Sequence, residues 1–248
     1  MASCGLIAGC VEAATDHITY YTVRILRTLP HDTASFTQGL VYYQGMLYES
    51  TGLHGRSTLQ QIDATTGIVR RTVAVPQVFA EGLVRWSNRL IQLTLQEQVA
   101  FIYNLTDFSQ IGQFQYETEG WGLTADQQAL IMSDGSDLLY FRDPYSFDII
   151  RTVQVTLNDE PLNRINELEY VQGLVYANIW GEDFIVQIDP DTGQVCGIID
   201  ARSLRQMQPS IERSDVLNGI AHNPEQNTLY LTGKNWPTLF EVTLVQGF

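Results

Sequence analysis

The clearest pattern along the chain is a short apolar run, a polar turn and a second run in which apolar and polar residues alternate. This pattern is typical of a β-hairpin. It occurs five times, at residues 38–52, 81–94, 121–133, 166–180 and 218–232. Recurrence of one hairpin along the whole chain predicts a repeat architecture.

A second turn follows each of the first four hairpins and opens with Asp or Asn, which favour turns. These turns lie at residues 63–67, 104–107, 143–146 and 189–193. The run after each turn, such as Ile68–Val73 or Ile149–Val155, gives its unit a fourth strand. Four strands that recur every 40 to 50 residues or so predict the blades of a β-propeller, since about 40–50 residues is the usual blade repeat.

The two ends of the chain complement each other. The fifth unit has a third strand at Thr238–Thr243 and then ends, so it lacks a fourth strand. Arg27-Thr28-Leu29 matches the fourth-strand segments Arg71-Thr72-Val73 and Arg151-Thr152-Val153. We therefore expect residues 21–29 to complete the last blade, which would leave no free sheet edge.

The predicted fold class is therefore all-β, a five-bladed β-propeller over residues 20–248 whose last blade is closed by the N-terminal strand. A β-sandwich would not explain the complementary ends. Residues 1–19 are predicted to be an N-terminal tail. A closed ring offers no obvious edge to share, so we expect a monomer.

The acidic balance of the chain limits its partners. Asp and Glu number 28 against 14 Lys and Arg, and no basic cluster occurs. Such a surface repels phosphate backbones and anionic lipid headgroups, which argues against nucleic-acid and membrane-surface partners. The three cysteines, Cys4, Cys10 and Cys196, form neither a CxxC pair nor a disulfide framework.

The N-terminal segment Leu6-Ile7-Ala8-Gly9-Cys10 resembles a lipoprotein lipobox, with Cys10 as the residue to be lipidated. A signal peptide needs a basic region and an apolar run of about 7–15 residues, and the residues before Cys10 are too few for both. A truncated or mis-set start and a chance match both stay open. No later segment approaches the roughly 18 apolar residues of a membrane span.

The first strands of all blades line the central channel of a propeller and run in one direction, so their first residues should gather at one mouth. These positions carry aromatic, carboxamide and acidic side chains: Phe36 and Gln38, Phe79 and Glu81, Glu119 and Trp121, Asn166 and Glu167, Asp215 and Asn218. Each has a structural explanation when taken alone. Their convergence favours a functional site centred on Glu81, because an acid between Phe79 and Gly82 is poorly placed for solvation.

Several common chemistries have no signature in this sequence. The four histidines, His17, His31, His54 and His222, lack metal-ligand spacing. There is no GxSxG nucleophile elbow and no glycine-rich phosphate loop. We therefore expect a site without metal or cofactor, built from a carboxylate, carboxamides, a lysine and aromatic walls.

The motifs at these positions resemble those of the plant and bacterial glutaminyl cyclases (glutamine cyclotransferases). The resemblance spans residues 21–245 and rests on the ordered segments 36–40 (FTQGL), 48–52 (YESTG), 79–82 (FAEG), 119–122 (EGWG), 166–169 (NELE), 178–180 (NIW) and 233–236 (GKNW). It implies an acyltransferase that closes the N-terminal glutamine of peptides and proteins into pyroglutamate and releases ammonia, independently of metal.

The resemblance also implies site residues. Glu81 matches the essential acid, and Lys234 and Asn166 are the further catalytic candidates. The substrate pocket would be lined by these residues together with Phe36, Gln38, Phe79, Trp121 and Trp180. One departure is clear: Leu95 stands fourteen residues after the acid, where the family usually carries Trp.

In the expected reaction the α-amine attacks the γ-carboxamide carbon of the same glutamine. Glu81 would take the proton of the amine and return one to the leaving nitrogen, and Lys234 would stabilise the oxyanion. Asn166 and Gln38 would bind the carboxamide. Burial should raise the pKa of Glu81 and Lys234 should lower it; the sequence does not decide which effect dominates.

Two alternatives stay open. Leu95 would suit a non-catalytic propeller that binds peptides or glycans, and a propeller lactonase or other hydrolase would generally need a channel metal, for which no ligand cluster is seen. The resemblance favours an extracytoplasmic protein, whether periplasmic, secreted or lipid-anchored.

Overall fold

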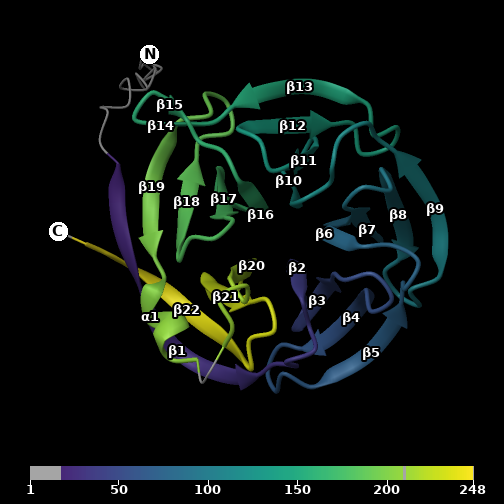
Figure 1. Ribbon diagram of the computed structural model, residues 1–248, viewed down its shortest axis with the longest axis horizontal. Coiled ribbons are helices and arrows are strands. Elements are labelled where there is room, and N and C mark those ends of the chain that lie inside the picture. Colours follow the sequence, from purple (N-terminus) through teal and green to yellow (C-terminus); the bar gives the residue numbers. More distant parts are fainter. Residues whose placement is uncertain (1–17, 209–210, 248) are drawn as a thin grey trace, which may run out of the picture.

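The computed structural model describes residues 18–208 and 211–247. Within these ranges the fold is all-β, with 22 strands and one short helix, α1 (Arg202–Gln206). The strands form sheets that Figure 1 shows arranged around a common centre. The predicted all-β class is confirmed. The predicted tail, with Cys4, Cys10 and the lipobox-like segment, lies almost entirely outside the described residues.

Three sheets each consist of four consecutive antiparallel strands. The first comprises β2 (Thr37–Tyr43), β3 (Met46–Thr51), β4 (Thr58–Asp63) and β5 (Val69–Ala74). The second comprises β6 (Ala80–Trp86), β7 (Arg89–Thr94), β8 (Val99–Asn104) and β9 (Gln110–Gln115). The third comprises β10 (Leu123–Ala125), β11 (Leu130–Ser133), β12 (Leu138–Arg142) and β13 (Ile149–Gln154).

The remaining long strands form one eight-stranded sheet in the order β16-β17-β18-β19-β1-β22-β21-β20. One half contains β16 (Ile165–Val171), β17 (Leu174–Ile179), β18 (Phe184–Ile188) and β19 (Val195–Asp200). The other half contains β20 (Leu217–Asn223), β21 (Thr228–Gly233), β22 (Thr238–Gln246) and β1 (Thr19–Pro30). A small hairpin of β14 (Thr156–Leu157) and β15 (Glu160–Pro161) precedes β16.

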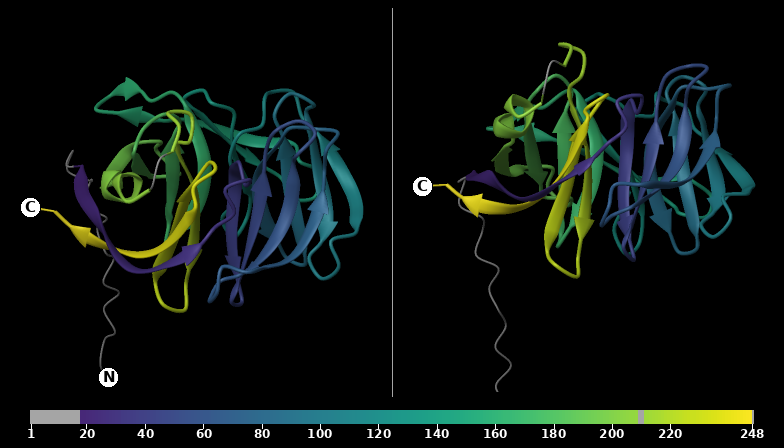
Figure 2. Two further views of the ribbon diagram at one scale, coloured as in Figure 1. Left: turned by 60° about the horizontal axis from the view of Figure 1, so that its bottom comes forward. Right: turned by 90° about the horizontal axis from the view of Figure 1, so that it is seen from below.

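The two chain ends meet in this sheet. Strand β1 pairs antiparallel with β22, from Tyr21 opposite Gln246 to Pro30 opposite Thr238 (Figure 2). The predicted pairing of the N-terminal strand with the last strand of the chain is therefore confirmed. The first residues of β1 also pair in parallel with β19, beginning with Thr19 opposite Gly197. This second pairing, which the sequence did not predict, joins the fourth and fifth groups of strands.

Burial follows the distance of each strand from the centre. The second strands β3, β7 and β17 are buried over five of their six residues, because apolar side chains of neighbouring sheets cover both of their faces. The outer strands β5 and β9 are largely exposed. The apolar core is therefore divided into clusters that lie between adjacent sheets.

The innermost strands approach each other so closely that glycine is required at their starts. A Cβ atom on Gly82 would lie 2.7 Å from the carbonyl oxygen of Trp121, and one on Gly122 would overlap the carbonyl oxygen of Asn166. The backbone N–H of Gly82 donates to that Trp121 oxygen at 2.7 Å. Main chains of neighbouring sheets are thus in direct contact, which fixes the side chains that flank these glycines.

The helical content of the fold is small. Among residues 18–208 and 211–247, no helix is long and apolar enough to cross a lipid bilayer.

The crowding around Gly122 gives a test of this packing. We expect G122A to lower the free energy of unfolding by about 1–3 kcal/mol, because the added methyl group must displace the main chain at Asn166. The matched control is G112A on the outer strand β9, where the nearest atom to a new Cβ is a methyl carbon of Ile102 at 3.5 Å. Urea unfolding of both variants measures the difference; equal losses would contradict the close approach of the inner strands.

Candidate active site

The innermost strands share an irregularity near their starts. The pairing register of four of them shifts, at residues 37–39, 80–83, 165–168 and 217–220. Such β-bulges re-aim side chains and are common beside active sites. The shifted segments contain the polar residues Gln38, Glu81, Asn166 and Asn218, all of them buried.

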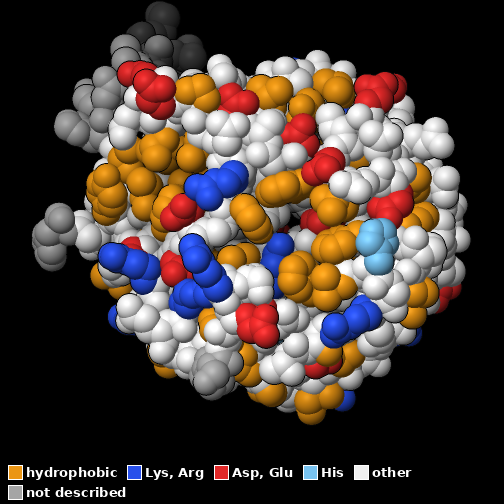
Figure 3. Space-filling model, viewed as in Figure 1, with side chains coloured by type: hydrophobic (Ala, Val, Ile, Leu, Met, Phe, Trp, Pro, Cys, Tyr) orange, Lys and Arg blue, Asp and Glu red, His pale blue; other side chains and the backbone are white. Residues whose placement is uncertain are grey.

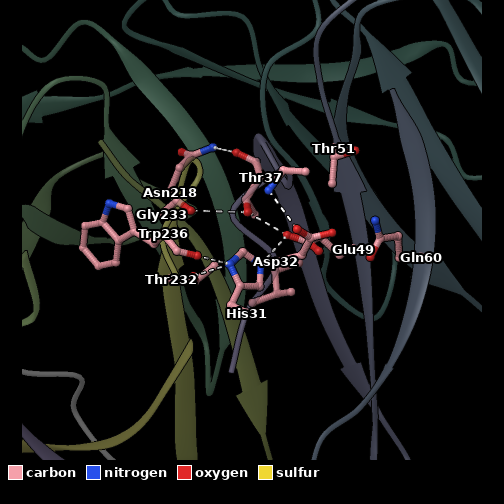
Figure 4. Close-up of polar contacts among 12 residues, drawn as sticks. His31, Asp32, Thr37, Glu49, Thr51, Gln60, Asn218, Thr232, Gly233 and Trp236 are labelled. Carbon is pink, nitrogen blue, oxygen red and sulfur yellow. Dashed lines mark hydrogen bonds and ion pairs between the residues drawn. The ribbon is translucent and has the colours of Figure 1, made fainter. Parts of the chain in front are cut away.

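Glu81 stands at the end of a chain of side-chain hydrogen bonds. Gln38 Nε2 donates to Glu81 Oε1 at 2.8 Å, and Asn218 Nδ2 donates to Gln38 Oε1 at 3.1 Å. The same Asn218 nitrogen donates to the carbonyl oxygen of Thr37 at 2.9 Å (Figure 4). These bonds fix the rotamer of Gln38, so its amide nitrogen always faces the Glu81 carboxyl.

Lys234 follows β21 and is buried, with 4% of its surface exposed. Its Nζ lies 4.7 Å from the ring centroid of Phe36, within cation–π distance. Burial lowers the pKa of Lys234, and the charge of Glu81 raises it again in part. The lysine is therefore a desolvated cation close enough to Glu81 for the two charges to influence each other.

The question that the sequence left open concerns the pKa of Glu81. Burial raises this pKa well above its usual value of 4.5, while Lys234 lowers it and Glu119 and Glu97 raise it further. Desolvation is the largest effect, so burial prevails over the nearby cation. Glu81 is consequently a carboxyl group that holds its proton more tightly than a solvated glutamate does.

Several of the predicted aromatic residues lie near Lys234 or close to Glu81 in sequence. Phe36, which contacts Lys234, meets Phe79 edge to face with their centroids 6.1 Å apart, and His54 packs against Phe79 at 5.8 Å. Trp121 Nε1 donates to Glu119 Oε2 at 3.1 Å, while Trp180 is 46% exposed. On the face of the molecule shown in Figure 3, hydrophobic side chains gather near the centre.

Two carboxamide oxygens are further polar groups of the candidate site. Asn166 Oδ1 and Asn218 Oδ1 are buried, and no donor among the described residues reaches either of them. A buried acceptor without a donor is costly. Both oxygens are therefore suited to accept N–H groups of a ligand. The backbone oxygen of Asn166 is already engaged, since Ser133 Oγ donates to it at 2.7 Å.

Some acids predicted at the mouth have other tasks. Glu167 Oε1 accepts the N–H of Leu40 at 3.1 Å and its Oε2 accepts that of Ile220 at 2.8 Å, so it ties β16 to β2 and β20. Asp215 accepts Asn235 Nδ2 at 2.9 Å and supports a loop. The sequence grouped these two acids with the residues at the mouth; in the structure backbone N–H groups engage the Glu167 carboxylate, and a loop side chain engages Asp215.

Leu95 is half-buried and lies between two parts of the site. Its N–H donates to the carbonyl oxygen of Phe79 at 2.9 Å, and its own carbonyl oxygen accepts the N–H of Gly120 at 3.1 Å. Trp86 lies at the opposite end of β6 from Glu81, about 16 Å along an extended strand. The ring of Trp86, although near in sequence, therefore does not take the place of the Trp that the family usually carries at position 95.

The described residues contain no group of three His, Cys, Asp or Glu side chains arranged to hold a metal ion.

Comparison with known proteins identifies the family of this chain. The family model of glutamine cyclotransferases matches residues 1–244. The chain belongs to the glutamine cyclotransferase family. The resemblance inferred from the motifs is thereby confirmed, and with it the assignment of the chain to a family of enzymes.

Two relatives support the glutamine cyclotransferase assignment. A protein of Arabidopsis thaliana named glutaminyl-peptide cyclotransferase is 37% identical over 230 residues, which cover 91% of this chain and 72% of that protein. The crystal structure of Myxococcus xanthus glutaminyl cyclase is similar at a TM-score of 0.89 and 38% identity, covering 94% of this chain and all of the other.

The raised pKa of Glu81 predicts a pH-dependent cost in stability. The folded protein keeps this proton where the unfolded chain has lost it, so stability is full below pH 4.5 and falls as pH rises toward the higher folded pKa. E81Q keeps an oxygen for Gln38 and carries no charge. We expect its Tm to exceed that of the wild type at pH 8 by at least about 2 °C and to equal it at pH 4. Thermal unfolding followed by circular dichroism measures both values, and a Tm difference between E81Q and wild type that does not grow from pH 4 to pH 8 would refute the raised pKa.

Proposed function

We propose that this protein is a glutaminyl-peptide cyclotransferase, which converts the N-terminal glutamine of peptides and proteins into pyroglutamate and releases ammonia. The observation that carries the proposal is the Glu81 carboxyl, buried at 3% exposure, bonded to Gln38 and close to the buried Lys234. Family membership and the names of the two relatives support the same reaction.

The finer description of the fold is part of this proposal. Five groups of four strands surround one centre, with β2, β6, β10, β16 and β20 innermost. We interpret them as the blades of a five-bladed β-propeller in which β1 supplies the last strand of the fifth blade. The site then lies at the mouth of the central channel, where the bulged strand starts converge.

The proposed reaction takes place within a single residue of the substrate. The α-amine nitrogen forms a bond to the γ-carboxamide carbon, and the bond from that carbon to the amide nitrogen breaks. Glu81 accepts the proton that the amine loses and donates one to the leaving nitrogen, which departs as ammonia. A carboxyl with a raised pKa suits both steps, since its ionised form is a stronger base and its protonated form persists nearer neutral pH.

The neighbouring groups have complementary tasks in this proposal. The free oxygens of Asn166 and Asn218 accept N–H groups of the amine or the carboxamide. Lys234 stabilises the negative charge that develops on the carboxamide oxygen. The rings of Phe36, Phe79, Trp121 and Trp180 hold the side chain in a folded pose. Orientation of this kind contributes up to about 7–11 kcal/mol in model reactions.

This chemistry assigns proton transfer to Glu81 and charge stabilisation to Lys234, so we propose a metal-independent mechanism that works without a cofactor. The partners are peptides or proteins that begin with glutamine. An extracytoplasmic location and a monomeric state remain part of the proposal, supported by the motif resemblance and by the pairing of the chain ends in β1 and β22.

Ammonia release from a glutamine-initiated dipeptide tests the function. We expect wild-type turnover that a strong chelator does not reduce, and a loss of about 10²–10⁴-fold in kcat for E81Q, the range that general acid–base catalysis supplies. Near-normal turnover in E81Q would overturn the assigned role of Glu81. A folded wild type without any turnover would instead favour a propeller that binds peptides or glycans.

Leu95 is the specific feature behind that second candidate. An aromatic ring at this position should make the binding free energy of the substrate more favourable by about 1 kcal/mol, the additional contribution of an aromatic contact. This corresponds to about a fivefold lower KM. We therefore expect L95W to lower KM with little change in kcat, and L95A to raise KM. Steady-state kinetics on the same dipeptide measures both. An L95W variant with unchanged KM would show that residue 95 does not contact the substrate.

A further inference from the structure

Behind the candidate active site lies a buried histidine–glutamate pair. His31 Nδ1 lies 2.6 Å from the carbonyl oxygen of Trp236, and His31 Nε2 lies 2.9 Å from Glu49 Oε1 (Figure 4). The two side chains are only 2% and 0% exposed. His31 directly follows β1, whereas Glu49 belongs to β3.

The contacts determine how the protons are distributed. A carbonyl oxygen only accepts, so Nδ1 carries a hydrogen that it donates to Trp236. The contact between Nε2 and Glu49 Oε1, at 2.9 Å, then contains one proton that the ring and the carboxyl share. Burial acts to lower the pKa of His31, but Glu49 and the Trp236 carbonyl outweigh it and raise that pKa above 6.5.

One side of the pair holds the segment that carries Lys234. Besides the bond from Nδ1 to Trp236, the backbone N–H of His31 donates to the carbonyl oxygen of Pro237 at 3.0 Å. The N–H of Asn235 donates to the carbonyl oxygen of Ser35 at 2.8 Å. Residues 31–35 therefore hold residues 235–237 by hydrogen bonds, and these bonds fix the position of the adjacent Lys234.

The other side of the pair reaches the hydrogen-bond chain of Glu81. Thr37 Oγ1 donates to the same Glu49 oxygen at 2.6 Å, and the Thr37 carbonyl oxygen accepts Asn218 Nδ2 at 2.9 Å. Asn218 then orients Gln38, which donates to Glu81. A single Glu49 oxygen thus connects His31 to the bulge that carries Gln38, the hydrogen-bond donor to Glu81.

A second ion pair on the same strand offers a comparison. Arg27 of β1 donates to Glu241 of β22, and Glu241 is likewise buried. Its other contacts are the carbonyl oxygens of Ala64 and Thr65, the Tyr230 hydroxyl and, through Glu241, Thr228. The Arg27–Glu241 pair joins β1 to β22, to Tyr230 and to the turn at residues 64–65, and it has no hydrogen bond to Lys234, Gln38 or Glu81.

We propose that His31 and Glu49 are positioning residues for the reaction: together they hold Lys234 and the Thr37–Asn218–Gln38 chain in register with Glu81. Buried ion pairs are often replaced by apolar residues of similar volume without loss of stability. The contacts of this pair, on one side with the segment of Lys234 and on the other with Thr37, give it a task besides stability. This inference rests on the proposed cyclotransferase function.

The experiment replaces each pair by apolar residues and compares activity with stability. H31L/E49M is the test variant, and R27M/E241M is the matched control on the same strand. We expect both to fold, with H31L/E49M losing about tenfold to 10²-fold in kcat, the loss that a displacement of about 1 Å causes. The control should retain its kcat and KM within about twofold. Wild-type kcat in a folded H31L/E49M variant would overturn the proposal.

If H31L/E49M does not fold, the E49Q variant tests the positioning role instead, since glutamine keeps the shape of Glu49 and carries no charge. A kcat below about one third of the wild-type value with KM unchanged would support positioning, because a merely structural role would not separate kcat from KM. An unchanged kcat would overturn it.

Hydrogen exchange separates this inference from the proposed function. The amides of Lys234 and Asn235 should lose protection in H31L/E49M but not in R27M/E241M, a result that requires no turnover. A wild type that releases no ammonia would defeat the cyclotransferase proposal alone. Unchanged protection of these two amides would defeat the positioning role alone.

Discussion

The structure depends on how the innermost strands satisfy their backbone hydrogen bonds. Each of these strands is the inner edge of its sheet, so part of its N–H groups has no neighbouring strand to pair with. Side chains from the next strands supply the acceptors. Glu167 accepts Leu40 and Ile220, Glu169 accepts His222 at 2.8 Å, and Asn178 Oδ1 accepts Gly219 at 3.0 Å. Polar residues at the centre are therefore required by the packing itself.

The same crowding sets the electrostatics of the site. Every acid at the centre is desolvated: burial raises the pKa of Glu167 well above its usual value and that of Glu169 to about 8. Glu167 receives two backbone N–H bonds, which favour its charged form. Glu81 receives a bond from the carboxamide of Gln38 and has a lysine nearby.

The sequence predicted the repeat, the four-stranded units and the pairing of the chain ends, because each depends on local periodicity and turn chemistry. It also singled out Glu81, Gln38 and Asn166, because polar residues recur near the starts of the innermost strands of several units. It could not place Glu167, because side-chain direction at a β-bulge departs from alternation. Similarly, the role of His31 depends on contacts with Glu49 and Trp236, which are distant in sequence.

Strand β1 links the closure of the sheet to the assembly of the site. Strand β1 pairs with β22, and the Arg27–Glu241 contact strengthens this pairing. His31, the residue after β1, contacts Glu49 and Trp236. Residues 32–36 then connect His31 to Thr37 and Gln38. Because the strand that pairs with β22 leads directly to His31, the same segment closes the sheet and contacts Glu49 and Trp236. The Glu81 carboxyl is thus linked to the pairing of the chain ends through Glu49, Thr37, Asn218 and Gln38.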